Sequence, residues 1–215
     1  MSSVGDELIR ERAAFRDTLV AMGPDVPTAC GSWTTSDLAV HVVMGELAAG
    51  LPSYPGRFLV GCGVRVDFLA SSNASMLARQ RRRHDFDWAV GRLRRDPPRA
   101  QRRGRIGAVS LLEVWAHHQD VLASASRPLP ASLPCLETVV PILVRYQRRP
   151  LEQHRIAVET PDRTWFEPHS GAQVRVNGSD PDICRWLSGR GGLDGVDVTG
   201  YQDVRDRIED LQLAI

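Results

Sequence analysis

Residues 113 to 120 read EVWAHHQD and place two carboxylates and two imidazoles within an otherwise apolar run. On an α-helix, with about 100° between successive residues, Glu113, His117 and Asp120 lie within about 60° of one another. His118 is turned by about 100° from His117, so the two histidines cannot share one role. A carboxylate and an imidazole four positions apart can both reach one ion at about 2.0 to 2.2 Å. Glu113 and His117 are therefore candidate metal ligands.

His41 is the candidate for a third ligand. It lies in the run LAVHVVMGELAAG, residues 38 to 50, which is apolar on nearly every side, and such a helix is normally buried. A buried carboxylate is costly unless it is paired or coordinates a metal. Two neutral imidazoles, one carboxylate and an open fourth position describe a catalytic site rather than a closed structural one. Asp120 is expected to orient a ligand or to face the open position.

Spacing alone leaves other interpretations of these residues open. An acid and a histidine four positions apart also form ordinary pairs on a helix surface. His41 could be a core histidine bonded to a backbone carbonyl, and Asp120 could belong to a solvated turn. The residues by themselves do not decide between these interpretations and a metal site.

The four cysteines show no paired spacing. They are Cys30, Cys62, Cys135 and Cys184. Their scatter argues against a disulfide framework and against a zinc site made of cysteines alone. We interpret them as small buried hydrophobic residues.

Helical spacing dominates the first 150 residues. Apolar residues from position 8 to position 22 form one stripe that ends before Gly23, which predicts a first helix. Thr34 and Asp37 have the spacing of a capping box, which predicts a second helix that ends near residue 50. Further helices are expected over 64–82, with a continuation or restart at 86–88 that stops before Pro97, over 106–125, and over 136–147 despite Pro141.

The period changes after residue 152. Residues 155–160, 163–168 and 172–178 alternate in polarity between turn residues and predict three strands. A helix over 180–190, a strand over 193–200 and a closing helix over 201–215 follow. The fold class is therefore mainly α with α+β, with a helical bundle over 1–150 and a small α/β domain over 151–215.

Composition and charge exclude several classes. No run approaches the roughly 18 apolar residues of a membrane span, and the acidic beginning of the chain lacks a secretory core, so we expect a cytoplasmic protein. The basic residues are all arginine, and eleven of them lie between Arg79 and Arg105. Few aromatic residues accompany them, so we interpret this stretch as a solvated surface and expect no nucleic-acid partner.

Two segments resemble a known family. CGSWTTSDLAVHVV, residues 30–43, and EVWAHHQDV, residues 113–121, are similar to segments of the mycothiol-dependent maleylpyruvate isomerase-like proteins, within the DinB/YfiT-like metal-binding superfamily. The resemblance implies a DinB-like up-and-down helical bundle that binds a divalent metal, usually zinc. It also implies a small C-terminal α/β domain similar to sterol carrier proteins. The arginine-only usage fits the GC-rich actinobacterial source in which mycothiol occurs.

The resemblance also implies roles for single residues. The family's metal ligands correspond to His41, Glu113 and His117, the trio that helical geometry selects. CRWLSGR, residues 184–190, resembles another family segment and makes Arg190 a candidate anion-binding residue. A helix C-terminal arginine favoured by the macrodipole is the alternative for Arg190. The middle of the chain, residues 52–88, matches no segment of the family, so the substrate is not implied.

Three functions follow from these residues. The first is a mycothiol-dependent isomerase or S-transferase in which the metal activates a thiol. The second is a metal-dependent hydrolase that uses the same site on a metal-bound water. The third is a non-enzymatic binding or regulatory protein. The sequence sets neither the identity of the metal nor the oligomeric state.

Overall fold

The structure is a computed structural model of the chain. It describes residues 2–47, 53–64, 83–125, 133–203 and 208. The chain divides into two compact units, and the boundary lies between Leu129 and Pro130. All but the first residue of the helix predicted over 64–82, and most of the closing helix predicted over 201–215, lie outside the described residues.

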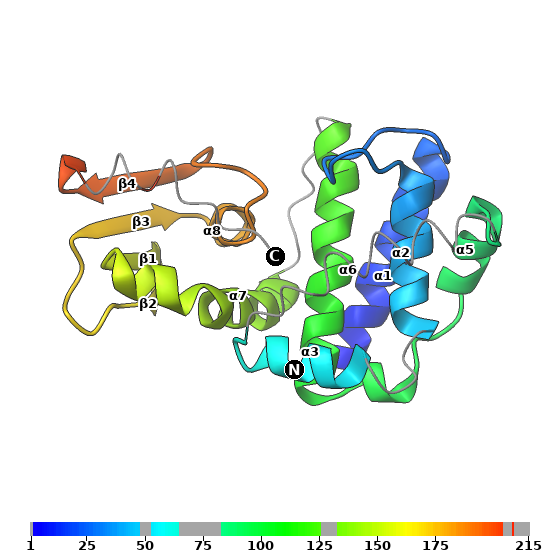
Figure 1. The fold of residues 1–215 in the computed structure, drawn as a ribbon, viewed down its shortest axis with the longest axis horizontal. Helices are drawn as coiled ribbons and strands as arrows, with labels where there is room; N and C mark the ends of the chain where they lie inside the picture. The colour runs from blue at the N-terminus through cyan, green and yellow to red at the C-terminus, as the bar shows by residue number, and fades with distance from the viewer. Residues whose placement is uncertain (1, 48–52, 65–82, 126–132, 204–207, 209–215) are drawn as a thin grey trace. The chain divides into compact units, whose positions relative to one another are not determined.

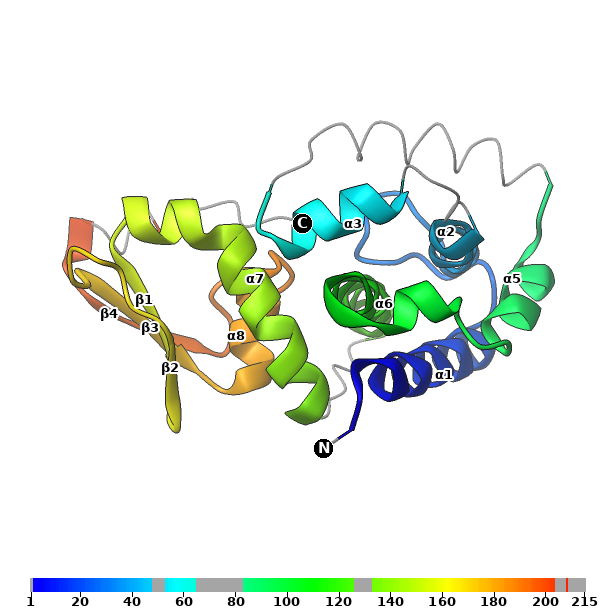
Figure 2. The same cartoon turned by 90° about the horizontal axis from the view of Figure 1, so that it is seen from below.

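The first unit is built from helices around α6 (Figures 1 and 2). Its elements are α1 (Val4–Met22), α2 (Thr35–Leu47), α3 (Ser53–Gly61), α5 (Phe86–Leu93), the 3-10 turn η1 (Arg99–Arg102) and α6 (Gly104–Ser124). Figure 2 shows α6 with α1 on one side and α2 and α3 on the other, and α6 contacts all three helices. Leu111 and Trp115 of α6 are buried, as are Phe15 and Leu19 of α1, and the two helices contact each other. Any polar side chain on α6 therefore faces another helix or the margin of the core.

In the part of the chain that the structure describes, the second unit contains a small mixed sheet and the helices α7 and α8. Its elements are α7 (Leu133–Gln153), β1 (Ile156–Thr160), β2 (Arg163–Phe166), β3 (Val174–Gly178), α8 (Asp180–Leu187) and β4 (Val196–Gly200). The strand order is β2-β1-β3-β4, with β1 parallel to β3 and the outer pairs antiparallel. Both α7 and α8 contact this sheet. The four predicted strands are confirmed.

The division between the units differs from the expected one. The sequence places the helix over 136–147 with the first 150 residues, whereas the compact units place α7 with the sheet. The physical reason is packing, because α7 contacts α8, β1 and β2. Helical period alone cannot reveal which neighbour covers an apolar face. The helix also runs longer than expected and includes both Pro141 and Pro150.

The other differences lie in the helical unit. The sequence did not predict α3, a short helix directly after Pro52. The predicted restart at residues 86–88 is confirmed by α5, which begins after the N-cap Asp85. Among the described residues, no helix is long and apolar enough to cross a membrane. The chain is mainly helical, with one small sheet in its second unit.

Candidate metal centre

Two helices bring the predicted trio together. His41 comes from α2, and Glu113 and His117 come from successive turns of α6. One donor atom of each lies within 4.8 Å of the other two. His41 Nε2 is 3.7 Å from Glu113 Oε1, and the two imidazole rings meet edge to face with centroids 5.0 Å apart. Neighbouring donors around a tetrahedral zinc ion stand roughly 3.4 Å apart, because each lies about 2.1 Å from the ion.

A capping box fixes the start of α2 and thereby the position of His41. The Thr34 N–H donates to Asp37 Oδ2 at 2.9 Å, and the Asp37 N–H donates to Thr34 Oγ1 at 3.4 Å. Such caps stabilise a helix by about 1 kcal/mol. The Thr35 hydroxyl also donates to the Gly23 carbonyl at 2.5 Å, which ties α2 to the end of α1. This predicted cap is confirmed.

Trp33 packs against both imidazoles. Its ring centroid lies 5.0 Å from that of His41 and 6.4 Å from that of His117. The indole therefore holds the two rings by van der Waals contact. The sequence pointed to Trp33 only as part of a resembling segment. Its contact with both candidate ligands comes from the loop that precedes α2.

His41 is buried and is neutral at physiological pH. Its side chain is 6% exposed, and burial, followed by the neighbouring His117, lowers the pKa of His41 to about 4. Its Nδ1 is buried without a hydrogen-bond partner among the described residues. The prediction that His41 faces protein is confirmed, whereas the backbone carbonyl of the competing interpretation is not found at Nδ1. A neutral imidazole carries the lone pair that a metal requires.

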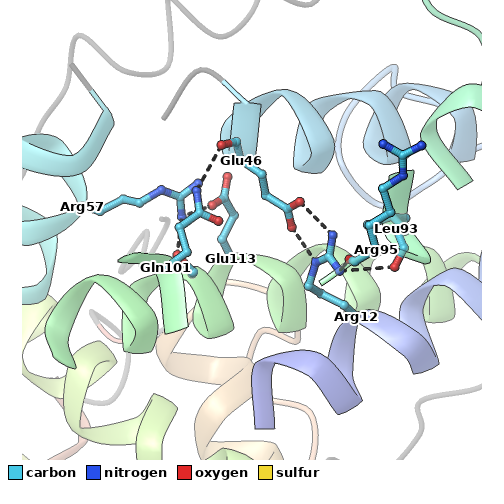
Figure 3. Close-up of polar contacts among 8 residues, drawn as sticks. Arg12, Glu46, Arg57, Leu93, Arg95, Gln101 and Glu113 are labelled. Carbon is cyan, nitrogen blue, oxygen red and sulfur yellow. Dashed lines mark hydrogen bonds and ion pairs between the residues drawn. The ribbon is translucent and has the colours of Figure 1, made fainter. Parts of the chain in front are cut away.

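Arg57 of α3 pairs with Glu113, a contact that the sequence did not predict. Its guanidinium forms an ion pair with Glu113 Oε2 and donates to the Ser110 hydroxyl at 3.3 Å. Burial alone raises the pKa of Glu113, but Arg57 and the two histidines outweigh it and leave that pKa below its ordinary value. Glu113 is therefore a carboxylate at neutral pH. Figure 3 shows Arg57 reaching it from the side of α3.

Gly45 leaves the room that this carboxylate occupies. A Cβ at position 45 would lie 3.1 Å from Glu113 Oε1 and 3.0 Å from an Arg57 Nη. Both distances are shorter than ordinary van der Waals contacts, so a larger residue would displace one of the two side chains. The last turn of α2 thus makes room for Glu113, and the turn before it carries His41. The sequence offered no signal for this beyond the glycine itself.

A second arginine–carboxylate pair lies beside the first (Figure 3). The buried Arg12 of α1 binds both oxygens of Glu46, at 2.5 and 2.7 Å, and donates to the carbonyl oxygens of Leu93 and Arg95. Burial raises the pKa of Glu46 despite this pairing. Glu46 is engaged by Arg12 and Glu113 by Arg57, so each carboxylate has its own cation. This network ties the end of α2 to α1 and, through Leu93 and Arg95, to the end of α5.

Asp120 lies against His117, as expected from their spacing. His117 Nδ1 is 3.1 Å from Asp120 Oδ2, and the Asp120 side chain is buried. A carboxylate oxygen only accepts, so this contact places the proton on Nδ1 and leaves the lone pair on Nε2. Carboxylates commonly fix the tautomer of a metal-binding histidine in this way. The role of Asp120 in orienting a ligand remains a prediction that this geometry supports.

His118 faces another helix. Its Nδ1 lies 2.7 Å from Glu11 Oε1 and its Nε2 lies 2.9 Å from Thr18 Oγ1, both on α1. The ring is buried, with only 3% of the residue exposed. Both of its nitrogens have partners inside the protein. The expectation that the two adjacent histidines differ in role agrees with this arrangement.

The remaining expected residues lie elsewhere. Arg190 belongs to the second unit and donates to the Ser188 carbonyl at 3.1 Å, so its anion-binding role stays a prediction. Arg83, Arg94 and Arg103 are exposed, as expected of a solvated surface, while residues 79–82 lie outside the described range. None of the four cysteines forms a disulfide.

The prediction that the cysteines are buried is confirmed for two of the four. Cys135 and Cys184 are buried, and burial, the largest influence, raises the pKa of the Cys184 thiol. Cys30 and Cys62 are partly exposed, so the expectation of burial is wrong for these two. Cys62 lies in the turn that follows α3, and Cys30 lies in a bend of the loop that precedes α2. Cys30 lies beside His117 and Asp120.

The fold and the site define a class: a helical unit with a histidine–glutamate–histidine cluster, joined to a small mixed-sheet unit. Among solved structures, the chain is similar to mycothiol-dependent maleylpyruvate isomerase, with 17% identity and a TM-score of 0.54. A histidine-to-alanine mutant of that enzyme gives 16% identity and a TM-score of 0.59. In both comparisons 93% of this chain and 96% of the other are covered. No protein-family model and no curated protein matches the chain. The likeness confirms the expected resemblance at the level of the fold.

Proposed function

We propose that this chain binds one divalent metal ion through His41, Glu113 and His117 and uses it in a mycothiol-dependent isomerisation or S-transfer. The observation that carries the proposal is the meeting of three donor atoms from α2 and α6 within 4.8 Å. The similar solved structures are of a mycothiol-dependent isomerase, which supports the choice of thiol and reaction class. Zinc is the expected ion.

The protonation states of the three residues fit a metal. Ligands must be deprotonated to bind, and each departure from that state costs affinity. The lowered pKa of His41 keeps its ring neutral at pH 7, and the lowered pKa of Glu113 keeps its carboxylate ionised. Asp120 leaves the Nε2 lone pair of His117 available. Two imidazoles and one carboxylate form an open set, with room for a further ligand from outside the protein.

Each residue has a defined task in this proposal. When bound, a divalent ion supplies positive charge that favours the thiolate form of a nearby thiol. His41 and His117 supply neutral nitrogen donors, and Arg57 holds one oxygen of Glu113 so that Oε1 faces His41. Trp33 shields both rings from water on its side. These contacts keep the three donor atoms close to one another.

Metal analysis of purified protein tests the first half of the proposal. We expect about one divalent ion per chain in the unchanged protein and loss of that ion in the double variant His41→Ala, His117→Ala. The matched control is His84→Ala with His154→Ala, because these two histidines lie outside the cluster. Full metal occupancy in the first double variant contradicts the proposal.

A thermal-shift screen of metals crossed with thiols tests the second half. A ligand that binds only the folded protein raises its apparent stability by mass action. We expect mycothiol to raise the unfolding temperature only when metal is present. Turnover of a substrate in the absence of any low-molecular-weight thiol assigns the site instead to the metal-dependent hydrolase. A metal that stabilises the chain with neither thiol binding nor turnover assigns it to the non-enzymatic alternative.

Several finer expectations belong to the same proposal. They are the DinB-like up-and-down arrangement of the first unit, the likeness of the second unit to sterol carrier proteins, anion binding by Arg190, and a cytoplasmic, actinobacterial setting. The helical first unit and the small mixed sheet of the second agree with the first two at a coarser level.

A further inference from the structure

A second group of metal-binding side chains lies next to the first. Cys30, His117 and Asp120 each offer a donor atom, and these atoms all lie within 4.8 Å of one another. The group combines a thiol, an imidazole and a carboxylate from two separate segments. Cys30 precedes α2, whereas the other two residues lie on α6. Neither sequence spacing nor the proposed function accounts for this cysteine.

The loop that carries Cys30 is held on α6 by its backbone. The Ala29 N–H donates to the Asp120 carbonyl at 3.0 Å, which fixes the next residue beside Asp120. The loop is closed on itself, because the Thr28 N–H donates to the Trp33 carbonyl at 3.0 Å and the Trp33 N–H donates to the Cys30 carbonyl at 3.2 Å. Gly31, with a φ of 60°, provides the turn that this closure requires. The position of Cys30 is therefore built into the fold.

We propose that Cys30, His117 and Asp120 form a second cation position for thiophilic divalent ions such as Cd²⁺ and Zn²⁺. Sulfur is a soft donor, and soft donors select such ions over Mg²⁺ or Ca²⁺. The cation replaces the thiol proton of Cys30, which is released to solvent, and a metal–sulfur bond forms. The partial exposure of Cys30 and His117 gives the ion access from solvent.

The two positions compete through the ring of His117. The nitrogen that faces Asp120 is Nδ1, at 3.1 Å from Oδ2, so this nitrogen serves the second position. In a neutral imidazole, coordination through Nδ1 moves the single ring proton to Nε2. A protonated Nε2 has no lone pair for the His41 and Glu113 group. Occupancy of the second position thus weakens binding at the first, and the reverse holds by linkage.

Cadmium titration of the reduced full-length chain tests the position directly. Thiolate coordination of Cd²⁺ produces an ultraviolet charge-transfer band, which we expect for the unchanged protein in a non-thiol reductant. The band should vanish in Cys30→Ser and persist in Cys62→Ser, the other partly exposed cysteine. Persistence of the full band in Cys30→Ser, or its absence from the unchanged protein, overturns the proposal.

Two further variants separate this position from the proposed function and from misfolding. Asp120→Asn keeps the backbone bond to Ala29 but loses a charged donor, so the Cd²⁺ affinity reported by the band should fall about tenfold or more. An unchanged affinity in Asp120→Asn contradicts the second position. His41→Ala with Glu113→Ala removes the first group, and the band should remain. Loss of the band there, with circular dichroism unchanged, shows that the cadmium signal belongs to the first group and also overturns the proposal.

Discussion

Two neighbouring histidines on α6, His117 and His118, belong to two different polar clusters of the helical unit. His118 and Glu11 satisfy each other, and Thr18 occupies the remaining ring nitrogen. His117 instead meets His41 and Glu113, and one donor atom of each of these three residues lies within 4.8 Å of the others. The same residue types thus make a closed structural cluster on one side of α6 and an open donor cluster on the other. The difference lies in whether the hydrogen-bonding capacity is already used.

Removal of the charge on Glu113 should produce the largest difference in metal affinity between the two clusters. Glu113→Gln keeps the shape of the side chain but removes the anionic donor, so the metal affinity should fall by about 100-fold or more. Glu11→Gln makes the same change beside His118 and should leave the affinity unchanged. Competition with a chromophoric chelator measures both variants. Equal losses in the two variants would remove the distinction between the clusters.

The pH dependence of stability should report on His41. Its pKa is lowered to about 4 in the folded chain, against an ordinary value of 6.5, so the unfolded chain binds more protons between these values. The contribution of the neutral His41 to the free energy of unfolding is fully present above about pH 6.5. It is lost as the pH falls to about 4, which lowers the free energy of unfolding by up to roughly 3 kcal/mol.

Urea unfolding of the metal-free protein at several pH values measures this contribution. The free energy of unfolding should decline less steeply in His41→Gln than in the unchanged chain between pH 6.5 and 4. A chelator in every sample keeps metal binding out of the comparison. Identical pH profiles for the two proteins would show that His41 is not held neutral by its surroundings.

The cluster of His118, Glu11 and Thr18 should contribute to the free energy of unfolding and not to metal affinity. His118→Ala leaves Glu11 and Thr18 without their partner and opens space in the buried contact between α1 and α6. The free energy of unfolding should fall by about 2 kcal/mol. Metal affinity, measured on the fraction that is folded, should not change. A loss of metal with full stability would instead place His118 in the donor cluster.

The smallest expected effect concerns the space around Glu113. Gly45→Ala introduces a methyl group 3.1 Å from Glu113 Oε1, so the metal affinity should fall by about fivefold as the carboxylate shifts. Alanine favours a helix over glycine by about 1 kcal/mol, which offsets the crowding in overall stability. Gly91→Ala is the matched control, because a Cβ at that helical position meets no atom within 4 Å. Equal affinities in the two variants would mean that Gly45 does not cradle the carboxylate.

Much of the candidate site followed from sequence periodicity. Helical spacing placed Glu113 and His117 on one face of α6, turned His118 away, and marked α2 as a buried helix with His41 inside it. The capping box of Thr34 and Asp37 is local chemistry, so the sequence determined the start of α2 closely. The strands of the second unit also followed from alternation and turn residues.

Contacts between distant segments were decided only by the tertiary structure. Arg57 reaches Glu113 from a helix that the sequence did not predict, and Cys30 reaches His117 through a backbone bond between Ala29 and Asp120. The sequence likewise could not place α7 with the sheet, because an apolar helix face is compatible with any apolar partner. The sequence by itself determined which residues share a helix face, since that depends on the 3.6-residue period. The pairing of those faces with residues far along the chain was decided by packing, which local spacing does not encode.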